Sequence, residues 1–239
     1  MATTKKSIIN KVIATETSNQ LRSTKESLTA EGTMLQLILT FSLFLIPLFA
    51  DSNLDNYLTR HSRSHNCVGG QVTPPQREYF SRTLERHPEI RTISQLRLDA
   101  GPFTEFFFQK CKGLEKFLTF DINNGSNARA TANYLSRKYG KVFHFMDGDS
   151  KSTVLQYVSQ FPSDKFDLIY IDASNSNQSF LQDILNCKMI AHENTFLWVD
   201  GYEHDHIKQA IHECQRNNII VIDRIIRKDD HTWAEAHYL

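Results

Sequence analysis

The chain has 239 residues, and its 27 acidic and 27 basic side chains cancel to give a pI near 7.1. This length accommodates one domain with an appendage, and the neutral balance argues against the strongly positive surface that nucleic-acid-binding proteins present. Four scattered cysteines without C-x-x-C spacing argue against a zinc site and a disulfide framework. We therefore expect a domain that binds a small-molecule substrate and no nucleic acid.

Two segments open the chain. Residues 1–31 are a polar tail rich in Ser, Thr, Lys and Glu, a composition typical of disordered or weakly helical segments. Residues 32–50 run for nineteen positions without a charge, close to the roughly 20 apolar residues that cross a bilayer. The run predicts a single-pass membrane protein anchored by a transmembrane helix over 32–50. A signal peptide with a long leader and a helix packed against a partner are the alternatives.

Basic residues flank the apolar run on both sides, so the rule that places positive flanks in the cytoplasm leaves the orientation open. Residues 51–75 contain Gly-Gly and Pro-Pro pairs without a clear period and are interpreted as a linker. Residues 76–87 place apolar side chains at helical spacing. We expect them to form a helix on the edge of a domain that occupies residues 76–239.

From residue 92 onward, β-rich runs alternate with helical stretches. Such alternation predicts a parallel sheet with helices on both faces. The last two runs are joined by a linker too short for a crossover helix, so they should pair antiparallel. The fold class is therefore α/β, a Rossmann-like, doubly wound, seven-stranded sheet with an antiparallel last strand. The expected strands are 92–98, 116–122, 142–146, 166–171, 195–199, 219–225 and 232–238, and the expected helices are 102–111, 128–138, 152–160, 179–189 and 204–216.

The first of these units has the layout of a nucleotide-binding βαβ unit. A buried strand leads into a tight turn at residues 99–101, and Pro102 then suits the first position of a helix. Twenty residues after the turn, the second strand ends in Asp121. An acid at that place accepts hydrogen bonds from ribose hydroxyls. The alternative is a helix cap or a turn acid.

Five short motifs follow the expected strands in order. They are Gln95-Leu-Arg97-Leu-Asp99-Ala-Gly101, Phe120-Asp121, Gly148-Asp149-Ser150, Phe166-Asp167-Leu-Ile-Tyr-Ile-Asp172-Ala173 and Val199-Asp200. With these motifs the chain resembles the class I S-adenosylmethionine-dependent methyltransferases, in particular their small-molecule branch. The resemblance covers residues 76–239 and implies that S-adenosylmethionine is the cofactor.

The resemblance also implies a role for each strand end. The turn after the first strand would cradle the methionine part of the cofactor, Asp121 would hold the ribose, and residues 148–150 would border the adenine. Asp172 would lie beside the sulfonium and the substrate, where a carboxylate is electrostatically favourable. The residues expected to contact the cofactor are Asp99, Ala100, Gly101, Asp121, Ile122, Gly148, Asp149, Ser150 and Asp172.

Each of these assignments has a plainer alternative. Asp149 and Ser150 are ordinary N-cap residues, and Asp172 is equally explained as a helix cap or a loop carboxylate. His204 and His206 belong to a dense acid–histidine cluster, and His204 together with Asp172 is the expected catalytic pair, the histidine acting as a general base. A solvated helix start is the alternative for both histidines. Asp172 and Asp200 alone supply too few ligands for a magnesium site, so no metal is expected.

These observations predict a membrane-anchored methyltransferase that acts on an O or N atom of a small molecule, with a homodimer as a possible way to complete the pocket. The alternative is an inactive methyltransferase-fold protein that serves as an interaction module. It is motivated by Gln95 and Arg97, which stand where related proteins have an acid and a glycine. A nicotinamide-dependent dehydrogenase is disfavoured because the first turn keeps one of the three glycines of that fingerprint.

Overall fold

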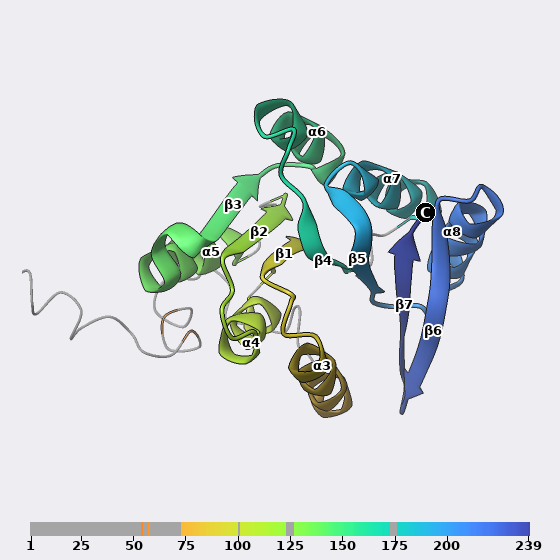
Figure 1. Ribbon diagram of the computed structural model, residues 1–239, viewed down its shortest axis with the longest axis horizontal. Helices are drawn as coiled ribbons and strands as arrows, with labels where there is room; N and C mark the ends of the chain where they lie inside the picture. The colour runs from red at the N-terminus through yellow and green to blue at the C-terminus, as the bar shows by residue number, and fades with distance from the viewer. Residues whose placement is uncertain (1–53, 55–56, 58–72, 100, 123–126, 173–175) are drawn as a thin grey trace, which may run out of the picture. The chain divides into compact units, whose positions relative to one another are not determined.

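The computed structural model describes residues 54, 57, 73–99, 101–122, 127–172 and 176–239 (Figure 1). The expected tail and apolar run at 1–50 lie outside the described residues, as does nearly all of the expected linker. Among the helices that are described, none combines the length and the apolar character that a bilayer crossing requires.

The described chain alternates strands and helices from the first strand to the last helix. In chain order the elements are α3 (Pro74–Arg86), β1 (Thr92–Leu96), α4 (Pro102–Lys110), β2 (Lys116–Asp121), α5 (Ala128–Tyr139), a 3-10 turn (Gly140–Val142), β3 (Phe143–Asp147), α6 (Ser150–Gln160), β4 (Phe166–Ile171), α7 (Asn177–Lys188), β5 (Ala191–Val199), α8 (Asp205–Arg216), β6 (Ile220–Lys228) and β7 (His231–Tyr238).

The seven strands form one sheet in the order β3-β2-β1-β4-β5-β7-β6. The pairs β1–β2, β1–β4, β2–β3 and β4–β5 are parallel. The last strand, β7, lies between β5 and β6 and is antiparallel to both. The predicted α/β sheet is therefore confirmed, including the adjacency of the first two strands and the antiparallel pairing of the last two runs.

Helices cover both faces of the sheet, as Figure 1 shows. Helices α3, α4 and α5 pack with the side chains on one face, and α6, α7 and α8 pack with those on the other. Within β4 the two faces alternate, with Leu168 and Tyr170 in the first cluster and Ile169 and Ile171 in the second. Both faces of this strand are buried, which explains its uninterrupted apolar sequence.

Two strand boundaries differ from the prediction. β5 begins at Ala191, four residues early, because the polar residues 192–194 extend the strand at the rim of the sheet, where side chains meet solvent. β6 continues to Lys228 because an edge strand tolerates exposed charges that hide its pattern in the sequence. The remaining element ends differ by two residues or fewer.

Helix α3 is fixed at its start and along its length. A capping box at Thr73 and Gln76 satisfies the first free N–H groups, and Pro74 occupies the first helical position. Its buried face presents Phe80, which stacks on Trp198 of β5 with ring centroids 4.2 Å apart. Trp198 and Trp233 are both fully buried.

Substituting Phe80→Ala should lower the free energy of unfolding by about 3–5 kcal/mol, because it removes a fully buried ring and leaves a cavity between α3 and the sheet. Urea denaturation followed by circular dichroism measures this loss. Phe161→Ala is the matched control. Its ring is half-exposed at the end of α6, so its removal should cost about 1 kcal/mol or less. Equal losses in the two variants would contradict the docking of α3 described here.

Candidate functional site

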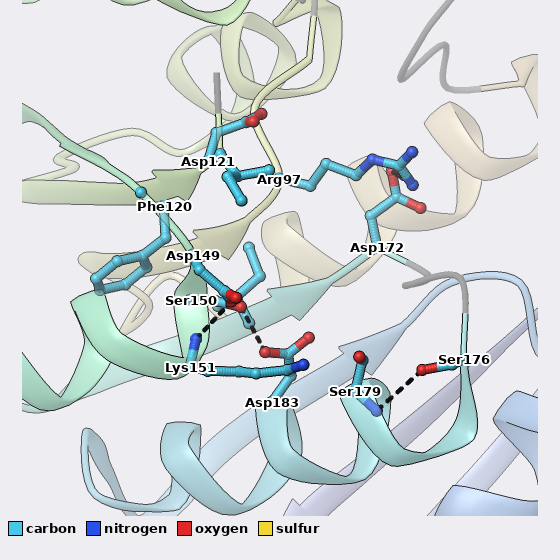
Figure 2. Close-up of a pocket in the computed structure, with 13 residues that line it drawn as sticks. Arg97, Phe120, Asp121, Asp149, Ser150, Lys151, Asp172, Ser176, Ser179 and Asp183 are labelled. Carbon is cyan, nitrogen blue, oxygen red and sulfur yellow. Dashed lines mark hydrogen bonds and ion pairs between the residues drawn. The ribbon is translucent and has the colours of Figure 1, made fainter. Parts of the chain in front are cut away.

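A cavity of about 320 Å³ opens at the carboxyl ends of β1, β2, β3 and β4 (Figure 2). Parallel strands bring their ends to one edge of the sheet, which is where open α/β sheets bind ligands. The volume is at the lower end of the range for small-molecule pockets. The lining residues are Leu96, Arg97, Phe120, Asp121, Ile122, Gly148, Asp149, Ser150, Lys151, Asp172, Ser176, Ser179 and Asp183.

Six of the nine residues expected to contact the cofactor line this cavity. These are Asp121, Ile122, Gly148, Asp149, Ser150 and Asp172. Asp99 and Gly101 are not among the lining residues, and Ala100 lies outside the described residues. The strand-end acids are therefore brought together as predicted, whereas the turn after β1 contributes through Arg97.

Asp121 fixes the turn after β1. Its Oδ2 atom accepts hydrogen bonds from the backbone N–H groups of Leu98, at 2.7 Å, and Asp99, at 2.9 Å. The carboxylate is nearly buried, and charged acceptors of this kind make the stronger hydrogen bonds of proteins. The turn-acid alternative is thus correct, and the same side chain also lines the cavity.

Gly101 has a packing role that the sequence pattern did not indicate. Its φ of +79° is a left-handed conformation that favours glycine, and it precedes α4. A Cβ atom at this position would lie 2.3 Å from the Cγ2 atom of Thr131 on α5. A side chain of α5 therefore occupies the space that a side chain at this position would need, and a contact of Gly101 with the cofactor stays a prediction.

Arg97 extends along the cavity toward Asp172, as Figure 2 shows. Its backbone φ is +76°, in the left-handed region that favours glycine. The guanidinium Nε lies 3.2 Å from Oδ2 of Asp99, and Nη1 lies 3.8 Å from Oδ2 of Asp172. The side chain is 44% exposed, so these ion pairs are screened by solvent and contribute little stability.

Gln95, near the end of β1, fixes the same turn through its side-chain hydrogen bonds. It is buried, and its amide Nε2 donates to the carbonyl oxygen of Arg97 at 2.7 Å. Its Oε1 accepts from the hydroxyl of Thr104 on α4, also at 2.7 Å. The neutral amide at this position therefore ties the turn to α4 as both a donor and an acceptor, which a carboxylate cannot do.

At the other end of the cavity, Asp149 caps α6, and its Oδ1 accepts from the N–H of Lys151 at 3.0 Å. The N-cap alternative is thus correct, although Asp149 also lines the cavity. The hydroxyl of Ser150 donates to Oδ1 of Asp183 at 2.6 Å, as Figure 2 shows.

Asp183 on α7 is a cavity residue that the sequence analysis missed. It is only 6% exposed, and burial raises its pKa to about 6. A carboxylate between Phe180 and Ile184 on the apolar stripe of an amphipathic helix was the signal that could have identified it.

Beyond the cavity, past the end of β5, four donors surround Asp200. Its Oδ1 faces Nε2 of Gln76 at 3.1 Å, Nε2 of His231 at 2.8 Å and the N–H of Gly201 at 3.0 Å. The hydroxyl of Tyr170 donates to Oδ2 at 2.9 Å. Protein donors thus occupy the oxygen atoms that a metal ion would need. Within the described part of the chain, no group of three or more His, Cys, Asp or Glu side chains is placed to hold a metal.

The structure does not bring His204 to the cavity. This residue is the N-cap of α8, with a 55% exposed side chain 3.8 Å from Glu203 and a ring stacked on that of His206. The solvated helix start is the better description, because His204 precedes the first residue of α8 and its side chain is mostly exposed. The histidine beside Asp200 is His231. It is 31 residues away in the sequence, and the antiparallel pairing of β7 with β5 brings it there.

Comparisons with known proteins address the fold. The family model described as a methyltransferase domain matches residues 99–202, from the turn after β1 to the loop after β5. An O-methyltransferase from Bacillus cereus in complex with SAH has a TM-score of 0.62 at 12% identity, with 84% of this chain and 97% of that chain covered. The domain has the class I methyltransferase fold.

Two further methyltransferase structures agree. A putative O-methyltransferase from Klebsiella pneumoniae has a TM-score of 0.58 at 15% identity, with 83% of this chain and 96% of that chain covered. An SAH-bound methyltransferase from Podospora anserina has a TM-score of 0.58 at 10% identity, with 83% and 95% covered. No curated protein matches the sequence. The resemblance to class I methyltransferases is thus confirmed at the level of the fold, and the cavity lies at the carboxyl ends of its parallel strands.

Replacing Asp183 by Asn should stabilise the methyltransferase domain above pH 6. The pKa of about 6 in the folded state exceeds the ordinary value near 4. The folded state therefore holds the proton more tightly, and the free energy of unfolding falls as the pH rises from about 4 to about 6. Asn lacks this titration, and its carbonyl oxygen can still accept from Ser150.

The gain of Asp183→Asn over the wild type should therefore be small at pH 4 and reach about 1–3 kcal/mol at pH 7. Urea denaturation at pH 4, 5, 6 and 7 measures this difference. Asp205→Asn, whose side chain is 89% exposed, is the control and should show no such pH dependence. A gain that is the same at pH 4 and pH 7 would show that the charge of Asp183 is not the cause.

Proposed function

We propose that this protein is an S-adenosylmethionine-dependent methyltransferase that transfers a methyl group to an O or N atom of a small molecule. The observation that carries the proposal is the convergence of Asp121, Ser150 and Asp172 from three strand ends on one cavity of the methyltransferase fold. The SAH-bound structural neighbours from Bacillus cereus and Podospora anserina support the choice of cofactor.

The cavity residues fit the nucleoside part of this cofactor. Both hydrogen bonds from the turn reach Oδ2 of Asp121, so Oδ1 can accept from ribose hydroxyls. Ser150 and the Asp149 carboxylate border the end of the cavity near α6, where they can meet an adenine. Four carboxylates line the cavity and favour a positively charged ligand over a neutral one.

The bound cofactor supplies an activated methyl group on a positively charged sulfur. The protein then has to hold the acceptor in line with that group and exclude water. We assign Asp172, at the end of β4, to face the sulfonium, because its carboxylate lines the cavity beside the guanidinium of Arg97. No side chain has to form a covalent intermediate for this chemistry.

One observation favours a second candidate, an inactive methyltransferase-fold protein that acts as an interaction module. Arg97 places a long charged side chain where a glycine would let the methionine part of the cofactor lie against the backbone. Its ion pairs with Asp99 and Asp172 hold it at that end of the cavity. Under this candidate the guanidinium excludes the cofactor.

Calorimetric titration of the full chain in detergent micelles with S-adenosylmethionine and S-adenosylhomocysteine distinguishes the two candidates. We expect micromolar dissociation constants, weakened about tenfold in Asp121→Asn, which loses one charge-assisted hydrogen bond worth about 1.5 kcal/mol. Asn is preferred to Ala because its carbonyl oxygen can still accept from the turn. Asp205→Asn, far more exposed and outside the cavity lining, should bind as the wild type does.

A folded wild type that binds neither compound would contradict the methyltransferase proposal. Binding that appears only in Arg97→Gly would then identify Arg97 as the cause and support the interaction module. Glycine adopts a φ of +76° without strain, so this variant should keep the turn intact.

We also propose that residues 32–50 anchor the protein to a membrane in a single pass. The support is the uncharged apolar run in the sequence. The full chain should remain in the membrane pellet after alkaline carbonate extraction, and a chain lacking residues 1–50 should move to the supernatant. Full-length protein in the supernatant without detergent would refute the anchor.

A further inference from the structure

We propose that His231, oriented by Asp200, is the base that removes the proton from a hydroxyl acceptor. The inference rests on the proposed function and deepens it, because it selects an ionisable hydroxyl as the class of acceptor. Neither His204 nor His231 is among the residues that line the cavity, but His231 is the histidine that the fold brings beside Asp200 at the strand ends.

The position of His231 follows from the antiparallel last strand. In the pairing of β5 with β7, Val199 lies opposite Ala234. His231 comes three residues before Ala234, so it lies past the end of β5, beside Asp200. β4 is the parallel neighbour of β5, and Asp172 follows its last residue. His231 therefore lies at the same edge as the cavity, on the side away from the nucleoside end.

The hydrogen bond to Asp200 orients the ring and assigns its proton. Nε2 of His231 is 2.8 Å from Oδ1 of Asp200, so this nitrogen donates and the neutral ring keeps its lone pair on Nδ1. Gln76, Gly201 and Tyr170 hold the carboxylate in place. A histidine ring oriented by a fixed carboxylate is the arrangement that general bases require.

Nδ1 faces a second carboxylate at a longer distance. It lies 3.5 Å from Oε1 of Glu203, beyond a normal hydrogen bond. Oε2 of Glu203 accepts from the N–H of Thr232 at 2.9 Å, which fixes this carboxylate too. The side chain of His231 is 30% exposed, so a ligand can reach it.

The charges that face His231 are Asp200 and Glu203 beside the ring and Asp172 beyond β4. Together they raise its pKa, and the hydrogen bond to Asp200 has the largest effect, opposed by partial burial. A raised pKa makes the neutral ring a stronger base toward the acceptor hydroxyl. The carboxylates also stabilise the imidazolium that proton transfer produces.

The proton balance is simple. The acceptor O–H bond breaks, a new N–H bond forms at Nδ1, and the electron pair stays on oxygen for the bond to the methyl carbon. The carbon–sulfur electron pair goes to the sulfur, which becomes neutral. The imidazolium lies between Asp200 and Glu203 until its Nδ1 proton passes to solvent, and no oxidant or reductant is needed.

The test uses the full chain in detergent. The protein is saturated with S-adenosylhomocysteine, and 4-nitrophenol serves as the acceptor probe. Absorbance distinguishes the yellow phenolate from the neutral phenol, and NMR of labelled histidine reports the charge of each ring. In the wild type we expect 4-nitrophenol to bind as the anion while His231 becomes the imidazolium. His231→Gln should lower the ratio of bound anion to bound phenol roughly tenfold, equivalent to about one pKa unit.

His192→Gln is the matched control. His192 faces Asp167 at 3.2 Å in a similar histidine–aspartate pair, but it lies near the start of β5, at the opposite edge of the sheet. This variant should behave as the wild type does. Glu203→Gln provides a second measurement if His231→Gln does not fold. This variant removes a negative charge that raises the pKa of His231, so the midpoint pH of the His231 titration in the presence of the probe should fall.

The outcomes separate the two proposals. Suppose that S-adenosylhomocysteine binds. The base assignment is then overturned, and the proposed function stands, if 4-nitrophenol does not bind, if it binds without changing the charge of His231, or if His231→Gln binds it as the wild type does. A response to the probe that is unchanged in Glu203→Gln also counts against it. If S-adenosylhomocysteine does not bind at all, the proposed function fails and the assignment of the base fails with it.

Discussion

A carboxylate removed from water must find hydrogen-bond donors, and this constraint organises the edge of the sheet. Asp200 satisfies it by collecting donors from α3, from β4 and from the start of β7, so three distant parts of the chain meet at one side chain. Asp121 does so by accepting two backbone N–H groups of the turn after β1. Asp121 therefore forms part of the cavity wall, while Asp200 holds together the neighbouring part of the same sheet edge.

This dual use explains what the sequence could and could not predict. Strand positions such as 166–171 were predictable because a run of apolar residues buried on both faces leaves a local signal. The strand-end acids were predictable because parallel topology sends them all to one edge. Their bonding was not, because whether Asp149 meets a ligand or an N–H group depends on atoms within 3 Å, which spacing along the chain does not reveal.

The remaining misses have the same origin. Asp183 was not predicted as a cavity residue, because a single acid among the apolar residues of a helix does not by itself indicate a ligand site. His231 was hidden because it is 31 residues from its partner and pairs with it only through an antiparallel return. His204 was the expected base because it belongs to a dense acid–histidine cluster in the sequence. Clustering along the chain did not identify the histidine beside Asp200, since His204 is mostly exposed and lies outside the cavity lining.

The turn after β1 combines strain with tight support. Arg97 and Asp99 both adopt positive φ, a conformation that costs non-glycine residues roughly 1–2 kcal/mol each. Gln95 and Asp121 hold the turn from both sides, so the surrounding bonds offset that cost. Strain of this kind is found where the backbone geometry serves a purpose. Here it directs the guanidinium along the cavity.

The place of β7 between β5 and β6 also has a consequence for how the protein is made. Residues 220–228 leave the ribosome before the strand that joins them to the sheet exists, because β7 is the one described strand with which β6 pairs. Until residues 231–238 emerge, the outer edge of β5 exposes unpaired backbone groups, which are prone to pairing with other chains. The strand that begins at His231 therefore joins the sheet after the strands around the cavity have been synthesised.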